Sequence, residues 1–274
     1  MNNIYKKVTF NNWAIKVCIA WFVIFSLWWI VLHLLNASSG QILIWADLYN
    51  FIALFGVIVG LVIARKWGGF KSTLGRATIM FSFGLLCEWF AGTAGAYLVW
   101  KVGTVPYPSL SDIGAFGALI FYAIAVIFLA KASGARLSLR SYKGKLIAII
   151  VPAILLSASF AIFLRAYEFD LSYPLITFLD IGYPLGEAFY VSMAILAYIL
   201  SRSYLGGIMK IPIRFFIAAL ISEYVADFLF LYDSHAGTYM VGGFNDLLFM
   251  TSYILMAISL IQLGVVFKTI KKES

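Results

Sequence analysis

The sequence predicts an all-α polytopic membrane protein with eight transmembrane helices arranged as four tandem hairpins. Hydrophobic residues make up 63% of its 274 residues and charged residues only 12%, and apolar runs long enough to cross a bilayer recur along the whole chain. So few polar side chains cannot cover a water-facing surface. The composition therefore excludes a soluble enzyme, a disordered tail and a nucleic-acid-binding domain, and we treat 1–274 as a single integral membrane domain.

Each span needs roughly 20 apolar residues at about 1.5 Å per residue. The first follows a polar segment that contains Lys6 and Lys7. It is longer than the apolar region of a signal peptide and no cleavage pattern follows it, so we expect it to be retained. The predicted spans lie near 11–35, 43–64, 77–99, 109–131, 146–166, 176–200, 213–232 and 244–267.

Basic residues occupy alternate connections between the spans. They are Lys66, Lys71, Arg76, Lys131, Arg136, Arg140, Lys143, Lys145, Arg202, Lys210, Arg214, Lys268, Lys271 and Lys272. The opposite connections hold only Lys101 and Arg165. Because cytoplasmic loops are enriched in Lys and Arg, both termini are expected in the cytoplasm and the protein in the plasma membrane. The net charge of +8 then reflects topology and contact with anionic lipid of the bilayer, and no nucleic-acid partner is expected.

An Asp opens the returning helix of each predicted hairpin. Asp47, Asp112, Asp180 and Asp246 are separated by 65, 68 and 66 residues, a nearly constant period that indicates duplicated units. An Asp at a helix N-terminus is favoured by the helix dipole, and Ser109 with Asp112 matches a capping box. We therefore interpret Asp112, Asp246 and Ser109 as helix caps. Asp180 lies deeper if the preceding apolar segment is already helical.

Four further carboxylates, Glu88, Glu187, Glu223 and Asp227, lie within apolar runs. An ionised carboxylate there costs about 2.5–3.5 kcal/mol, so such residues usually face the interior of a bundle and carry function. Glu223 and Asp227 are four residues apart and share one helix face; Asp180 and Glu187, seven apart, share another. If these faces meet, a carboxylate-lined pocket forms in the outer half of the bundle. Whether Glu88 joins it is left open.

Few side chains are available to neutralise this pocket. Arg165 is the candidate counter-charge, and Tyr183 and Tyr224 are candidate walls. Three alternatives remain open: the carboxyl groups bind a cation, they hold protons, or they pair with Arg165 and hydroxyls and only fix helix packing. Pro184, beside Glu187, is expected to kink its helix.

The sequence identifies no cofactor. Cys18 and Cys87 lie in apolar runs and form no disulfide or metal motif, and His33 and His235 occur in no spaced ligand pattern. The presence of a metal is left undetermined. A nucleophile elbow, a phosphate-binding glycine loop and a Schiff-base lysine in the last two spans are all absent from the sequence.

Three outer-loop motifs resemble a family. The segments 105–112 (VPYPSLSD), 179–187 (LDIGYPLGE) and 237–247 are similar to the multi-helix membrane sensor regions that precede some bacterial and archaeal diguanylate cyclases and histidine kinases. The likeness covers about 75–267. It implies an input module that feeds a cytoplasmic output domain. This chain departs from the pattern because Glu187 stands where an Asp commonly follows the Tyr-Pro-Leu-Gly motif.

Only 268–274 follows the last predicted span, so any signal is expected to pass through a separate cytoplasmic or membrane signalling protein. The sequence thus favours a membrane sensor or ligand-binding protein for a small ligand, cation or proton. A secondary transporter of a cation or small solute is the first alternative. An intramembrane enzyme using an acid pair such as Glu223 and Asp227, and a structural subunit of a membrane complex, are the others.

Overall fold

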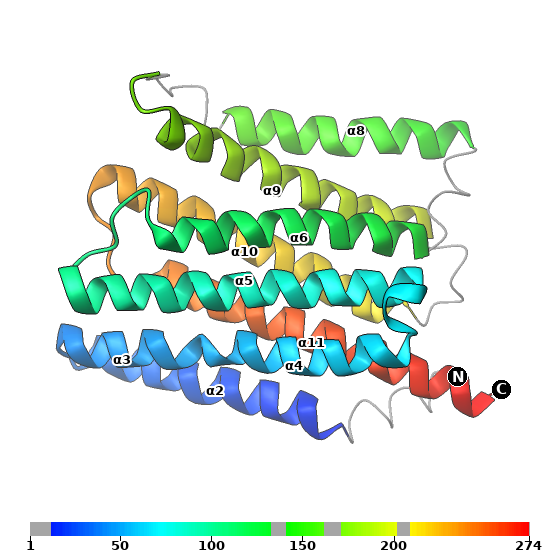
Figure 1. Cartoon of the computed structure of the whole chain (residues 1–274), viewed down its shortest axis with the longest axis horizontal. Helices are drawn as coiled ribbons and strands as arrows, with labels where there is room; N and C mark the ends of the chain where they lie inside the picture. The colour runs from blue at the N-terminus through cyan, green and yellow to red at the C-terminus, as the bar shows by residue number, and fades with distance from the viewer. Residues whose placement is uncertain (1–11, 133–140, 162–170, 202–208, 274) are drawn as a thin grey trace.

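The computed structural model describes residues 12–132, 141–161, 171–201 and 209–273, and these form one bundle of long helices that run side by side (Figure 1). No strand occurs within these ranges, which confirms the predicted all-α class. The elements are α2 (Trp13–Leu34), α3 (Ser39–Tyr49), α4 (Phe51–Lys66), the short 3₁₀ helix η1 (Gly69–Lys71), α5 (Thr73–Val102), α6 (Leu110–Ala132), α8 (Tyr142–Ser159), α9 (Pro174–Ser201), α10 (Lys210–Ala236) and α11 (Phe244–Glu273).

Seven helices of the described chain are long and apolar enough to cross a membrane when α3 and α4 are counted as one unit. They are α2, the α3–α4 unit, α5, α6, α8, α10 and α11. The 28-residue helix α9, which covers the predicted sixth span, is not counted among these seven. The chain therefore has the helices of a multi-pass membrane protein.

The second predicted span consists of two helices. α3 begins at Ser39, earlier than expected, because Ser38 and Gln41 form a capping box in which the Ser38 N–H donates to Gln41 Oε1 at 3.2 Å. α3 and α4 then meet at Asn50, whose side-chain amide donates to the carbonyl of Trp89 on α5 at 2.9 Å. The apolar periodicity on both sides of this residue hides the break from a sequence reading.

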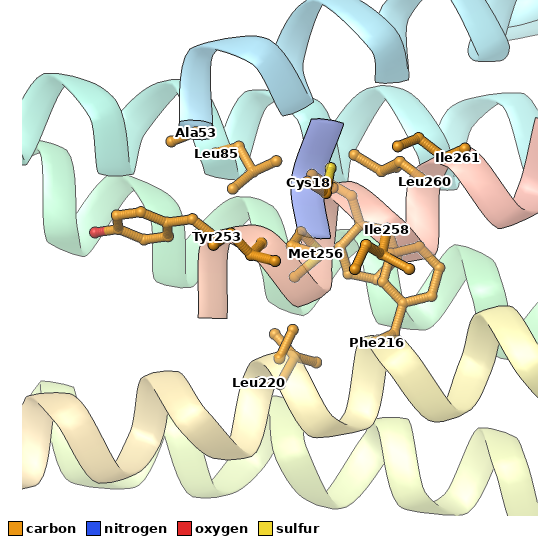
Figure 2. Close-up of a cluster of buried hydrophobic side chains, with 14 of the residues drawn as sticks. Cys18, Ala53, Leu85, Phe216, Leu220, Tyr253, Met256, Ile258, Leu260 and Ile261 are labelled. Carbon is orange, nitrogen blue, oxygen red and sulfur yellow. The ribbon is translucent and has the colours of Figure 1, made fainter. Parts of the chain in front are cut away.

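α11 forms the centre of the apolar core. It contacts α2, α4, α5 and α10, and its residues Met256, Leu260 and Ile261 are buried among side chains from the surrounding helices (Figure 2). Tyr253 lies at the edge of this cluster, with its hydroxyl directed away from the apolar side chains (Figure 2). The core therefore ends where a polar region begins.

Charge is segregated along the bundle. We call one end of the bundle the basic end (Figure 1). The helices that finish there are α4, α6, α9 and α11, and the helices that start there are α2, α5, α8 and α10. Its described residues include Lys66, Lys71, Arg76, Lys131, Lys143, Lys145, Lys210, Arg214, Lys268 and Lys271. Lys101 is the one Lys or Arg described at the opposite end. Arg136, Arg140 and Arg202 lie outside the described residues.

Candidate functional site

Three helices bring four carboxyl side chains together at mid-bundle. Glu88 comes from α5, Glu187 from α9, and Glu223 and Asp227 from successive turns of α10. Glu88 lies within hydrogen-bonding reach of Glu223, and Glu187 lies within the same reach of Asp227. These four residues are the carboxyl cluster. Glu88, Glu187 and Glu223 are 6%, 3% and 1% exposed, and Asp227 is half-buried.

The carboxyl cluster is short of hydrogen-bond donors. Tyr253 donates its hydroxyl to Glu88 Oε2 at 3.2 Å. Both oxygens of Glu223 lack a donor among the described residues. Ser252 lies beside Glu223, but its hydroxyl donates to the carbonyl of Ala219 at 2.8 Å. A buried carboxyl group without donors costs free energy, so the contact of Glu223 with Glu88 needs a shared proton to be favourable.

No Lys or Arg within the described ranges forms an ion pair with the carboxyl cluster. Arg165, the predicted counter-charge, lies outside the described residues. Two ionised carboxylates present only acceptor atoms to each other, so each close pair requires a proton or a cation between its members. The cluster is therefore arranged to hold positive charge.

Buried tyrosines surround the carboxyl cluster. The rings of Tyr122 and Tyr190 pack edge to face with centroids 6.1 Å apart, and the buried Tyr122 hydroxyl has no partner among the described residues. Neither tyrosine was among the candidates from sequence. Their position in the middle of apolar runs is the signal that could have identified them, because a tyrosine hydroxyl at that depth needs a partner.

A cavity of about 120 Å³ adjoins the cluster. It lies between α3, α5, α6, α10, α11 and the connections at the end opposite the basic end. Glu88 and Asp227 belong to both the cavity and the cluster. Small residues of α5 make room for it. Its described lining is Leu43, Ala46, Asp47, Tyr49, Asn50, Glu88, Ala91, Gly92, Gly95, Ala96, Val99, Val105, Ala115, Asp227, Phe230, Tyr239, Val241, Asp246, Phe249 and Tyr253.

Two lining residues have an acceptor without a donor among the described residues. The side-chain amide nitrogen of Asn50 donates to the carbonyl of Trp89, and Asn50 Oδ1 is unpartnered. Asp47 accepts from Trp100 Nε1 at 2.9 Å through Oδ2 and leaves Oδ1 unpartnered. From the sequence, Asp47 was predicted only as part of the repeat. Asn50 was not predicted, because an isolated Asn in an apolar run carries no motif.

Tyr239 closes the cavity from the connection between α10 and α11. Its ring packs edge to face on Phe230, with centroids 5.0 Å apart. Burial, and then the nearby Asp246 carboxylate, raise the pKa of Tyr239 well above its ordinary value. The residue therefore presents a neutral phenol and an aromatic face to the cavity.

The predicted caps make the expected contacts. Asp112 accepts the backbone N–H of Ser109 at 2.6 Å, and Ser109 Oγ accepts the N–H of Ser111 at 3.2 Å. Asp246 accepts the backbone N–H of Gly242. Both aspartates also accept from tyrosines, Asp112 from Tyr183 at 3.0 Å and Asp246 from Tyr49 at 3.3 Å.

Asp180 is placed differently from the caps. α9 begins at Pro174, so Asp180 lies inside the helix, where it accepts from the Tyr107 hydroxyl at 2.6 Å. Tyr224 interacts with Ser159 of α8. Four of the predicted site residues do not line the cavity: Asp180, Glu187, Tyr183 and Tyr224. The aromatic walls of the cavity are formed by other residues. α9 continues through Pro184, whose carbonyl accepts from Ser159 Oγ at 2.8 Å.

The described residues contain no group of three or more His, Cys, Asp or Glu side chains arranged to hold a metal ion. Cys18 is buried and Cys87 is half-buried, and both are free thiols. His33 Nδ1 lies 2.8 Å from the carbonyl of Trp29, and the side chain of His235 is outside the described set.

The chain matches no protein-family model, no curated protein and no solved structure. The function has to be inferred from the carboxyl cluster, the cavity and the distribution of charge.

Proposed function

We propose that this chain is a multi-pass membrane sensor that binds protons or a small ligand at the carboxyl cluster and the adjoining cavity. The observation that carries the proposal is the contact of carboxyl groups from α5, α9 and α10 at mid-bundle, without a Lys or Arg partner in the described chain. Ionisable groups at such depth are costly and mark functional sites.

The proposed topology has eight spans in four hairpins. We place the protein in the plasma membrane. The segregation of Lys and Arg at one end of the bundle supports an orientation in which this end and both termini face the cytoplasm. The cavity then lies toward the outer face, where an external ligand has access. The resemblance of the outer-loop motifs to membrane sensor regions agrees with this orientation.

Sensing would act through helix packing. A proton between Glu88 and Glu223 ties α5 to α10, and a proton between Glu187 and Asp227 ties α9 to α10. Loss of either proton leaves two like charges on facing helices, which favours a more open packing. Tyrosines and one further acid lie within electrostatic range of the cluster: Tyr122, Tyr183, Tyr190, Tyr253 and Asp112.

The pH dependence of stability tests this proposal. Because protonated pairs attract and ionised pairs repel, the thermal unfolding midpoint of the purified protein in nanodiscs should rise as the pH is lowered from about 9 to about 5. Glu223→Gln keeps the shape of a protonated Glu223 and should make this dependence clearly shallower. Tryptophan fluorescence recorded during the same scan reports the change in packing.

Asp233→Asn is the matched control, because Asp233 lies on the same helix outside both the cluster and the cavity. It should keep the pH dependence of the unsubstituted protein. An identical pH profile for Glu223→Gln and the unsubstituted protein would reject the carboxyl cluster as the responsive element.

A secondary transporter is the second candidate, favoured by the break between α3 and α4. Discontinuous helices line substrate sites in many transporters, and Asn50 at this break lines the cavity. Proteoliposomes with an imposed pH gradient should then accumulate a radiolabelled cation or solute, and Glu223→Gln should abolish the accumulation. Binding without accumulation leaves the sensor as the function.

A further inference from the structure

The lining of the cavity selects ligands by charge. Four carboxyl side chains contribute to it, and no Lys, Arg or His occurs among its described lining residues. The four are Asp47, Glu88, Asp227 and Asp246. A concave site lined by one sign of charge attracts the opposite charge and disfavours anions.

The hydrogen-bonding capacity left in the cavity is mainly acceptor capacity. Asn50 is only 4% exposed, and its Oδ1 has no donor within the described chain. Oδ1 of Asp47 also has no donor within the described chain. The hydroxyl protons of Tyr49 and Tyr253 are already directed to Asp246 and Glu88. A ligand that satisfies this site must therefore bring its own donors.

The remaining walls are aromatic and the space is small. The five aromatic residues of the lining are Tyr49, Phe230, Tyr239, Phe249 and Tyr253. Aromatic faces attract cations, and most strongly when water is excluded. A cavity of about 120 Å³ is smaller than the ~300 Å³ at which sites for drug-sized ligands begin, so it suits a ligand of a few non-hydrogen atoms.

We propose that the cavity binds a small organic ammonium ion that carries N–H donors. Its N–H groups donate to Asn50 Oδ1 and Asp47 Oδ1, and its hydrocarbon part lies against the aromatic walls. The inference rests on the proposed function, because it names the ligand class of the same site.

Calorimetric titration of the full-length protein in nanodiscs near neutral pH tests the ligand class with four probes. Propylammonium should bind saturably, with a dissociation constant on the order of 0.1–1 mM for so few atoms. 1-Propanol has the same size without the charge, tetramethylammonium has the charge without N–H groups, and sodium has neither hydrocarbon nor N–H. Each should bind at least about tenfold more weakly. Absence of saturable propylammonium binding, or equal binding of tetramethylammonium or sodium, overturns the proposal.

Substitutions locate the bound ammonium ion. Asp47→Asn preserves size and removes charge, and should weaken propylammonium binding by about tenfold. Tyr239→Leu removes a ring from a connection outside the helices and should weaken binding, whereas Tyr239→Phe should retain it. Asp233→Asn, the same chemical change outside the cavity, should leave the affinity unchanged. Unchanged affinity in both Asp47→Asn and Tyr239→Leu overturns the assignment of the site.

The two proposals fail separately. If propylammonium does not bind but Glu223→Gln still flattens the pH dependence, the ammonium ligand is rejected and the proton-responsive cluster stands. If the pH dependence is also absent from the unsubstituted protein, the proposed function itself is rejected.

Discussion

Glu223 shows how a single residue departs from what stability alone requires. Its side chain is 1% exposed and neither oxygen has a donor among the described residues. A buried carboxyl group without donors costs free energy, and a proton shared with Glu88 is needed to offset that cost. Glu88, its neighbour, differs because Tyr253 supplies a donor. The donor-free oxygens therefore make Glu223 the member of this pair that depends most on a shared proton.

Tyr253→Phe tests the value of that donor. The substitution removes the hydroxyl bonded to Glu88 and keeps the ring, which stacks with Tyr49 and Phe249 at centroid distances of 6.4 Å each. The free energy of unfolding should fall by about 1–2 kcal/mol, since a buried acceptor loses its partner. Denaturant unfolding in detergent micelles measures it.

Tyr232→Phe is the matched control, because Tyr232 is 65% exposed. Its free energy of unfolding should stay within about 0.5 kcal/mol of the unsubstituted value. Equal losses for both substitutions would show that the hydroxyl of Tyr253 contributes nothing specific.

At the scale of elements, small residues set the distance between helices. Gly60 of α4 faces Ser82 of α5 and Leu260 of α11, and a methyl group at this position would overlap the Ser82 hydroxyl. Helices in membranes associate through such small-residue contacts, because apolar burial by itself gains little against lipid. The contact holds α4 against both α5 and α11, and so positions Glu88 and Tyr253 across from each other.

Gly60→Ala should destabilise the bundle by about 1–3 kcal/mol through overpacking. Gly40→Ala is the matched control: Gly40 lies in the first turn of α3 with open space where a methyl group would be added. There the change should be neutral or stabilise by up to about 1 kcal/mol, through helix propensity. The thermal unfolding midpoints of the two variants measure this difference. A midpoint lowered as much in Gly40→Ala as in Gly60→Ala would contradict the packing argument.

At the scale of the whole molecule, opposite charges occupy different parts of the bundle. The basic end carries nearly all described Lys and Arg, while the carboxyl cluster and the cavity lie in the middle and toward the other end. This separation is the basis of the proposed orientation in a membrane, and it keeps most of the described Lys and Arg side chains away from the cavity. The proposed direction of sensing, from outside to the cytoplasm, depends on it.

Thiol labelling of whole cells tests the orientation. In a chain with Cys18→Ala and Cys87→Ala, we expect Met240→Cys, at an exposed position of the α10–α11 connection, to react with a membrane-impermeant maleimide in intact cells. Lys143→Cys, exposed at the basic end, should react only after the membrane is permeabilised. The reverse pattern would place the cavity on the cytoplasmic side.

The sequence predicted the helices well and their boundaries less well. Hydropathy located the long apolar helices because the need to satisfy backbone groups in lipid leaves few alternatives. It missed the break at Asn50, since the apolar residues on either side form one uninterrupted pattern. The early start of α3 follows from a local capping box and was readable in principle from Ser38 and Gln41.

The amino-acid sequence by itself determined the class of protein, the approximate positions of its helices, and the identity of the acidic residues placed too deep to be accidental. Composition and spacing decide these, because they act locally along the chain. Only the tertiary structure decided that Glu88 faces Glu223, that Glu187 faces Asp227, and that Asn50 and Asp47 line a cavity with Tyr239. Such contacts join helices far apart in the chain, and they depend on how each helix is rotated against its neighbours, which no single-helix pattern specifies.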